Sequence, residues 1–431
     1  MWSPAAGWSS MIRQVDAVVA QHGAGSEGIS TGDHDPSGQR ADAAFENAHV
    51  DVQNEALYIH APQHGRAECN ECGIRSSQDL DHWFGPFWRF GLRWGRRTMN
   101  TAAPVTTPVE DLQALLGAEM ASVNDLIRER MASRNAPRIP EVTAHLVGAG
   151  GKRLRPLLTL AGAHLFGYAG QDHVRLAATV EFIHTATLLH DDVVDESRNR
   201  RGRPTANLLW DNKSSVLVGD YLFARAFQLM VETGSIQVLG ILSDTAATIA
   251  EGEVLQLSAI GNIETTEKTY LEIIRGKTAA LFAAATEVGG LVAGASKAEA
   301  AALRAYGDCL GMSFQITDDV LDYGGVATRL GKDVGDDFRE GKLTLPVIRA
   351  IAGGNETERA FWSQAMDGKR ADDLTLERAQ QVLARTGALE SARETANSYA
   401  QEARSALEAL PDRPLRQILD GLAQFVVARL N

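Results

Sequence analysis

From residue 107 to its C-terminal end, the chain is dominated by the apolar spacing of amphipathic helices, with apolar residues three or four positions apart. Thr107-Pro108-Val109-Glu110 has the spacing of a capping box and opens the first such stretch, 109–131. A second capping box, Ser296-Lys297-Ala298-Glu299, opens a helix that we expect to end near Gly324-Gly325. Both helix starts are therefore predicted from the positions of four residues.

The region after residue 105 contains no alternating run long enough to build a sheet, and no proline occurs between Pro204 and Pro346. Long helices tolerate no internal proline, so this interval suits a set of them. The pattern predicts an all-α protein of roughly a dozen helices.

Residues 1–98 differ, because Gly, Ser, Asp, His and Gln are scattered there without helical or strand periodicity. This composition predicts a disordered N-terminal extension, followed by a folded domain over 99–431. The extension lacks the basic start and apolar core of a secretory signal, and its acidic residues argue against a transit peptide. One interpretation is that translation naturally begins at Met99.

Two features of the extension have a functional interpretation. Cys69 and Cys72 have the spacing of half a zinc site, with His64 and His82 nearby, but a second cysteine pair is missing. The stretch 83–97 is aromatic and basic and could contact a membrane surface.

Composition narrows the possible partners and compartment. The net charge of −13 over 431 residues argues against nucleic acid as a partner. Three cysteines cannot build a disulfide framework, which favours a reducing compartment, the cytoplasm. No apolar run reaches about 18 residues, so we expect membrane contact to be peripheral at most.

Candidate chemistry begins with Asp191, Asp192 and Asp195, at the polar end of an apolar helical run. Asp191 and Asp195 lie one turn apart on one helix face, where two carboxylates can hold Mg²⁺ and leave its other positions to phosphate. Arg200 and Arg201 follow, and arginine suits bidentate phosphate contacts.

The same aspartate pattern returns as Asp318, Asp319 and Asp322, again after an apolar helix. One such motif could be a solvated helix end. Two motifs that face each other would form a magnesium–diphosphate clamp, and this interpretation is favoured by the repeat.

Further cationic and polar residues could complete such a site. Lys152 and Arg155 lie in a glycine-bounded basic turn before a helix, where they could bind a second anion. His184 lies two turns before Asp191 on the same face. The remaining candidates are Lys277 and Thr278, Gln315, and the polar loop 331–337 with Lys332.

The ordered region resembles a trans-type polyprenyl diphosphate synthase of the long-chain kind (octaprenyl, solanesyl or decaprenyl) that supplies quinone side chains. The matching stretches are GGKRLRP at 150–156, FIHTATLLHDDVVDESRNRRGRPT at 182–205, GDYLFARAF at 219–227, GKT at 276–278, FQITDDVLDY at 314–323 and GKDVGDDFREGKLTLP at 331–346. Nothing before Met99 resembles the family.

The resemblance implies an isoprenoid synthase-type helical bundle around a deep central cavity, usually as a homodimer. It implies Mg²⁺-dependent, head-to-tail condensation of isopentenyl diphosphate with an allylic diphosphate, with about three Mg²⁺ ions per site. The catalytic residues would be Asp191, Asp192, Asp195, Asp318, Asp319, Asp322, Lys277 and Arg200, with Asp191, Asp195 and Asp318 as metal ligands. The allylic diphosphate would contact Arg200, Lys277, Thr278, Gln315 and Lys332. Isopentenyl diphosphate would contact Lys152, Arg155, His184 and Arg201.

Product length should depend on the residues below the first aspartates. Ala186 and Thr187 lie roughly 6–7 Å down the helix axis from Asp191 and are small, whereas bulky aromatics stop growth there in the family. Val180 and Ile183 beyond them are aliphatic. We expect a deep tunnel and a product of about eight to ten isoprene units, although its end point is not predictable.

Three alternatives compete with this interpretation. A short-chain farnesyl or geranylgeranyl diphosphate synthase would need a bulky residue deeper in the tunnel. A terpene cyclase would not be expected to carry the 150–156 motif or the second Asp-Asp-x-x-Asp. A non-catalytic partner subunit should have lost some carboxylates or cations, and none is missing from the motifs.

Overall fold

The computed structural model describes residues 49–53, 56–61, 65–69, 106–133, 135–148, 151–200, 202–324, 335–366 and 373–430. Contacts divide the chain into two compact units, Met1–Ala102 and Ala103–Asn431.

The described part of the first unit is a three-stranded antiparallel sheet. Its strands are β1 (His49–Gln53), β2 (Ala56–Ala61) and β3 (Gly65–Cys69), hydrogen-bonded in that order. β-branched and aromatic side chains such as those of Val50, Tyr58 and Ile59 are typical of strands. Disorder of the extension over 1–98 stays a prediction. The strands are too short for their alternation to stand out in the sequence.

Several predictions for the extension lie outside the described residues. Cys72, His64, His82 and the stretch 83–97 are among them, so the half zinc site and the membrane contact stay predictions.

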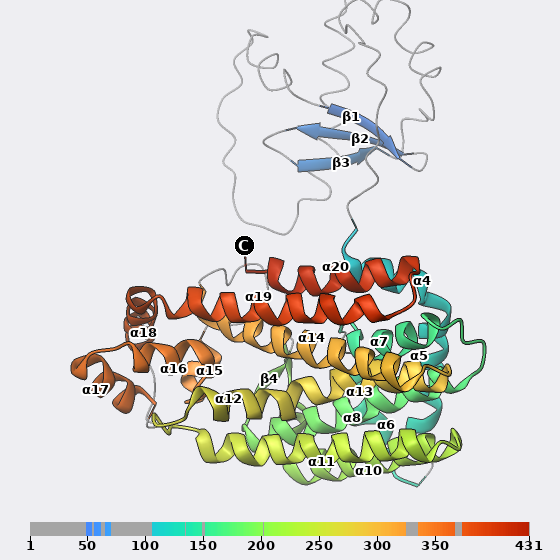
Figure 1. Ribbon diagram of the computed structural model, residues 1–431, viewed down its shortest axis with the longest axis horizontal. Coiled ribbons are helices and arrows are strands. Elements are labelled where there is room, and N and C mark those ends of the chain that lie inside the picture. The colour runs from blue at the N-terminus through green and yellow to red at the C-terminus, as the bar shows by residue number, and fades with distance from the viewer. Residues whose placement is uncertain are drawn as a thin grey trace, which may run out of the picture. The chain divides into compact units, whose positions relative to one another are not determined.

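The second unit is a helical bundle (Figure 1). Its first half comprises α4 (Pro108–Leu115), α5 (Gly117–Met131), α6 (Arg138–Gly148), α7 (Leu154–His164), α8 (Asp172–Val194), the short strands β4 (Asn199–Arg200) and β5 (Arg203–Pro204), α9 (Ala206–Leu209), α10 (Asn212–Glu232) and α11 (Ile236–Ala259). Its second half comprises α12 (Glu267–Ile274), the π-helical turn η2 (Arg275–Ala279), α13 (Ala280–Val292), α14 (Lys297–Tyr323), α15 (Asp336–Arg339), α16 (Leu345–Ala352), α17 (Glu356–Ala365), α18 (Asp373–Thr386), α19 (Ala388–Ala406), the 3-10 turn η4 (Leu407–Ala409) and α20 (Pro414–Ala428).

Both predicted capping boxes are confirmed. The Thr107 hydroxyl accepts from the Glu110 N–H while the Glu110 carboxylate accepts from the Thr107 N–H, and Ser296 and Glu299 form the same pair at the start of α14. That helix ends at Tyr323, with Gly324 as its C-terminal cap. The all-α prediction for this unit is confirmed, and helices outnumber the expected dozen because one-turn segments such as α9 and α15 join the long ones.

Helix α8 runs through the larger of two hydrophobic cores and packs against α5, α7, α10 and α13. Apolar side chains around most of its circumference are buried, so it lacks the one-sided stripe of a surface helix. A second core joins α12, α14 and α16–α19. Within the described ranges, no helix is long and apolar enough to cross a membrane.

Candidate active site

The first aspartate motif lies at the C-terminal end of α8. Asp195 caps the helix, and its N–H donates to the Asp191 carbonyl oxygen over 2.8 Å. Asp192 is fully buried, and its Oδ1 accepts from Arg200 Nε at 2.8 Å. Its Oδ2 is also buried but has no hydrogen-bond partner. Burial raises the pKa of Asp192, although the Arg200 charge opposes this rise.

Lys277 reaches this motif from the π-helical turn η2. Its Nζ lies 2.7 Å from Glu253 Oε2 on α11 and 3.6 Å from Asp191 Oδ2. Burial, followed by the charge of Asp191, raises the pKa of Glu253 to about 7, with Lys277 acting in the opposite direction. Glu253 is thus a fourth carboxylate, beside the three of the first motif.

The next residue in η2 connects to the second motif. The Thr278 hydroxyl donates to Gln315 Oε1 at 2.9 Å, and Gln315 Nε2 donates to Asp319 Oδ1 at 2.8 Å. Asp319 Oδ2 accepts from the Tyr270 hydroxyl at 2.6 Å. Burial, followed by the charge of Asp337, raises the pKa of Asp319 to about 8. Consecutive residues, Lys277 and Thr278, therefore link the two aspartate motifs.

Lys342 provides a second link. Its Nζ lies 3.1 Å from Asp195 Oδ2. Burial lowers the pKa of Lys342, but Asp195 and Asp337 raise it more, so the ammonium stays charged between the motifs. The N–H of Asp337 donates in turn to Asp322 Oδ2 at 3.1 Å. Asp322, at the end of the second motif, has a pKa raised to about 7 by burial and then by Asp337.

The second motif also contacts the C-terminal end of the described chain. Asp318 Oδ1 lies 2.9 Å from Arg429 Nη2, and the Arg429 guanidinium lies 5.5 Å from the centre of the Phe314 ring. Each of Asp191, Asp195 and Asp318, the three predicted metal ligands, is thus paired with one cation.

The basic segment at the start of α7 forms a separate cationic group, with Lys152 before the helix and Arg155 as its second residue. Arg155 Nη1 lies 3.2 Å from His184 Nε2, and its guanidinium lies 4.4 Å from the centre of the Phe282 ring. Lys152 Nζ lies 5.5 Å from the centre of the Phe425 ring on α20. The structure therefore brings Arg155 and His184 together. Arg201 and Lys332 lie outside the described residues.

The four predicted chain-length residues differ in exposure. Val180, Ile183 and Ala186 are completely buried in the larger core, whereas Thr187 is partly exposed and donates its hydroxyl to the His184 carbonyl oxygen at 2.8 Å. The role of all four residues in a tunnel stays a prediction.

Sequence reasoning missed three charged residues of this site: Glu253, Lys342 and Arg429. Lys342 lies within the quoted stretch 331–346 and could have been found there. Glu253 lies on α11 two residues after Glu251, and Arg429 follows the last residue of α20, so the sequence pattern does not distinguish either from the charges of a solvated face.

Comparisons with known proteins identify the family of the chain. The polyprenyl synthetase family model matches residues 136–383. Octaprenyl diphosphate synthase of Escherichia coli (strain K12) is 44% identical over 321 residues, covering 74% of this chain and 99% of that protein. The crystal structure of a decaprenyl diphosphate synthase from Rhodobacter capsulatus is 63% identical, covers 75% of this chain and 100% of its own, and has a TM-score of 0.73.

A polyprenyl synthase from Caulobacter crescentus CB15, solved with calcium and isoprenyl diphosphate, is 50% identical, covers 75% of this chain and 98% of its own, and has a TM-score of 0.72. The chain therefore belongs to the polyprenyl synthetase family, which confirms the resemblance to long-chain polyprenyl diphosphate synthases and makes the protein a prenyltransferase.

Proposed function

We propose that the protein condenses isopentenyl diphosphate with an allylic diphosphate, head to tail, to make a long-chain all-trans polyprenyl diphosphate for a quinone side chain. The observation that carries this proposal is the link through Lys277 and Thr278, which joins the two aspartate motifs in one site. The octaprenyl and decaprenyl relatives favour a long product over a short one.

Magnesium fits the donor set of this site. Asp191, Asp195 and Asp318 each use one carboxylate oxygen in an ion pair. Burial, with a smaller contribution from Asp195, raises the pKa of Asp191 although Lys277 opposes the rise. The six aspartates of the two motifs and Glu253 outnumber the four cations paired with them, Lys277, Lys342, Arg200 and Arg429. We propose that these carboxylates hold about three Mg²⁺ ions, which supply positive charge against the departing diphosphate.

Two separate groups of side chains would bind the two substrates. Arg200, Lys277 and Lys342 would bind the allylic diphosphate, with Lys332, and stabilise the negative charge that develops as its C–O bond breaks. Thr278 and Gln315 would present their dipoles to the resulting cation.

Arg155 and His184, with Lys152 and Arg201, would hold isopentenyl diphosphate so that its double bond attacks the allylic carbon. A new carbon–carbon bond forms and leaves a cationic carbon in the isopentenyl unit. The carbon next to it loses a proton to the released diphosphate, which restores a double bond. The condensation therefore needs no side chain as a base.

We propose that two copies of the chain form a homodimer in the cytoplasm. Apolar side chains are exposed along α10 and α11, the helices at the lower edge of the bundle in Figure 1. They are Val216, Leu217, Phe227, Val231, Ile236, Val254 and Leu257. A soluble monomer rarely exposes so many neighbouring apolar residues, whereas a symmetric partner would cover them.

The proposal is tested by incubating the purified full-length protein with Mg²⁺, labelled isopentenyl diphosphate and farnesyl diphosphate, then sizing the dephosphorylated product by chromatography. We expect one long polyprenol, and loss of product when a chelator removes Mg²⁺. Asp191→Ala should lower turnover at least about a hundredfold, because it removes a carboxylate at the reacting diphosphate.

Asp125→Ala, at an exposed aspartate on α5, should leave turnover unchanged. A short product would favour the farnesyl or geranylgeranyl alternative. Near-normal activity of Asp191→Ala would contradict the clamp, and no product from the unmodified protein would favour the partner-subunit alternative.

A further inference from the structure

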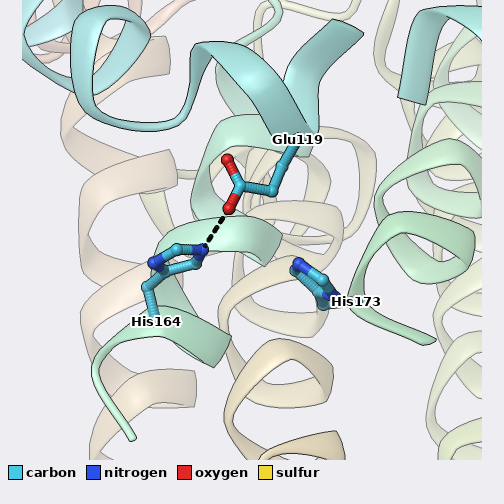
Figure 2. A group of neighbouring side chains, drawn as sticks. All are labelled: Glu119, His164 and His173. Atoms are coloured by element: carbon cyan, nitrogen blue, oxygen red, sulfur yellow. Dashed lines mark hydrogen bonds and ion pairs between the residues drawn. The ribbon is translucent and has the colours of Figure 1, made fainter. Parts of the chain in front are cut away.

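A group of metal-ligating side chains lies far from the aspartate motifs. Glu119 comes from α5, His164 is the last residue of α7, and His173 is the second residue of α8 (Figure 2). One ligand atom from each lies within 4.8 Å of the others. Asp191 is 18 residues further along α8, which is about 27 Å along the helix axis. This group is therefore separate from the proposed catalytic centre.

His173 has an unused nitrogen. The residue is only 5% exposed, and its Nδ1 is buried without a hydrogen-bond partner. Burial, followed by the charge of His164, lowers the pKa of His173, so its imidazole is neutral and keeps a lone pair. A buried polar atom in a folded protein usually has a partner, and here the three side chains point toward one another.

Glu119 and His164 lie close to the spacing of two metal ligands. Glu119 Oε1 and His164 Nε2 share a hydrogen bond of 3.0 Å, which a bound ion would replace, and ligands on a tetrahedral zinc ion lie about 3.4 Å apart when each bond is about 2.1 Å. Both side chains are more than a quarter exposed, so an ion could enter from solvent. Small rotations of the three side chains would close the site.

The surroundings orient His173 but do not compete for the ion. The Tyr168 ring meets the His173 ring edge-on, with the ring centres 5.3 Å apart. Asp172, the nearest other carboxylate in sequence, accepts from the Tyr168 hydroxyl at 3.3 Å and from Arg175 Nη1 at 2.5 Å. Its charge is therefore already paired, and the ligand set is two imidazoles and one carboxylate.

We propose that Glu119, His164 and His173 bind a divalent transition-metal ion, best matched by Zn²⁺, that ties α5 and α7 to the start of α8. Two imidazole nitrogens favour zinc or cobalt over magnesium, which prefers oxygen ligands. The three protein ligands leave one position for water. An ion bound only in the folded state raises the stability of that state, so the site would stabilise the bundle at this end of α8.

The test is a Co²⁺ titration of the full-length protein, followed by displacement of Co²⁺ with Zn²⁺. Both steps are done in excess Mg²⁺, which occupies the carboxylates of the two aspartate motifs. Visible absorption reports Co²⁺ with nitrogen ligands. The unmodified protein is compared with Glu119→Gln and His164→Gln, and with His145→Gln as a matched control. His145 lies on α6, and its Nε2 contacts the Pro204 carbonyl oxygen at 2.8 Å.

We expect the unmodified protein and His145→Gln to bind one equivalent of Co²⁺ more than Glu119→Gln and His164→Gln. Zn²⁺ should raise the unfolding temperature of the unmodified protein and of His145→Gln more than that of Glu119→Gln and His164→Gln. Equal binding and equal Zn²⁺ effects in all four proteins would overturn the proposal. Histidines and cysteines of the first unit contribute equally to all four, and Glu119→Gln should retain prenyl transfer in Mg²⁺.

Discussion

Thr187 is the position at which we expect a substitution to alter product length most directly. It is partly exposed and lies one helical turn before Asp191, whereas Ala186 beside it is completely buried. Thr187→Phe should shorten the polyprenyl product, because an aromatic ring would occupy space that the growing chain needs. The measurement is the length of the dephosphorylated product made from farnesyl and isopentenyl diphosphates.

Leu115→Phe is the control, since Leu115 is 52% exposed and lies on α4, away from the aspartates of α8. It should leave product length unchanged. Ala186→Phe is a poorer test, because forcing a ring into a closed core costs about 1–3 kcal/mol or more and would lower stability. An unchanged product from a folded Thr187→Phe protein would exclude this position as a determinant of length.

At the scale of single residues, the sequence identified those that belong to repeated or closely spaced patterns. Asp191 and Asp318 were predicted because each starts the same motif after an apolar helix. Glu253 was not, since its position beside Lys277 depends on how α11 packs against η2. Contacts between distant elements leave no local pattern, and for this reason the Glu119, His164 and His173 group was also missed.

At the scale of elements, the π-helical turn η2 is what places Lys277 and Thr278. A π-turn adds a residue to the helical repeat, so neighbouring side chains take directions that an α-helix would not give them. The turn lies against α11 at Gly252 and Gly276, where a Cβ on Gly252 would come within 2.8 Å of the Lys277 nitrogen. Only glycine allows this approach.

Gly252→Ala should therefore push α11 away from η2 and displace the Lys277 ammonium from Asp191. We expect kcat to fall at least about tenfold, a loss of about 1.4 kcal/mol of transition-state stabilisation. The control is Gly240→Ala on the same helix, where an added Cβ meets nothing within 4 Å. Steady-state kinetics on both variants test this, and equal kcat values for the two would show that the close approach is not needed.

Elements differ in how well the sequence predicts them. The starts of α4 and α14 were predicted because a capping box is encoded in four consecutive residues. The turn η2 was not, because nothing in Arg275–Ala279 marks the change from α-helical to π-helical hydrogen bonding. The sheet β1–β3 was missed because its strands are only 5–6 residues long.

At the scale of the whole molecule, the apolar side chains of α10 and α11 predict assembly. Val231 is 63% exposed and Phe227, one turn away, is 41% exposed, and both line a hollow with Arg130 and Glu232. Because these two side chains are already about half covered, burying the rest of them is worth about 1.5–3 kcal/mol per protomer, enough to matter for a dimer. A monomer would not gain this free energy, because both side chains would stay in contact with water.

Val231→Asp should weaken the proposed homodimer, because association would bury a second carboxylate beside Glu232, which already pairs with Arg130. Sedimentation velocity at several protein concentrations should show a dimer for the unmodified protein and a shift toward monomer for the variant, by at least about a hundredfold in dissociation constant. Leu115→Asp, at a residue 52% exposed on α4, should keep the dimer. If both variants sediment as dimers like the unmodified protein, the dimer interface lies on another face. If the unmodified protein sediments as a monomer, the proposed dimer is wrong.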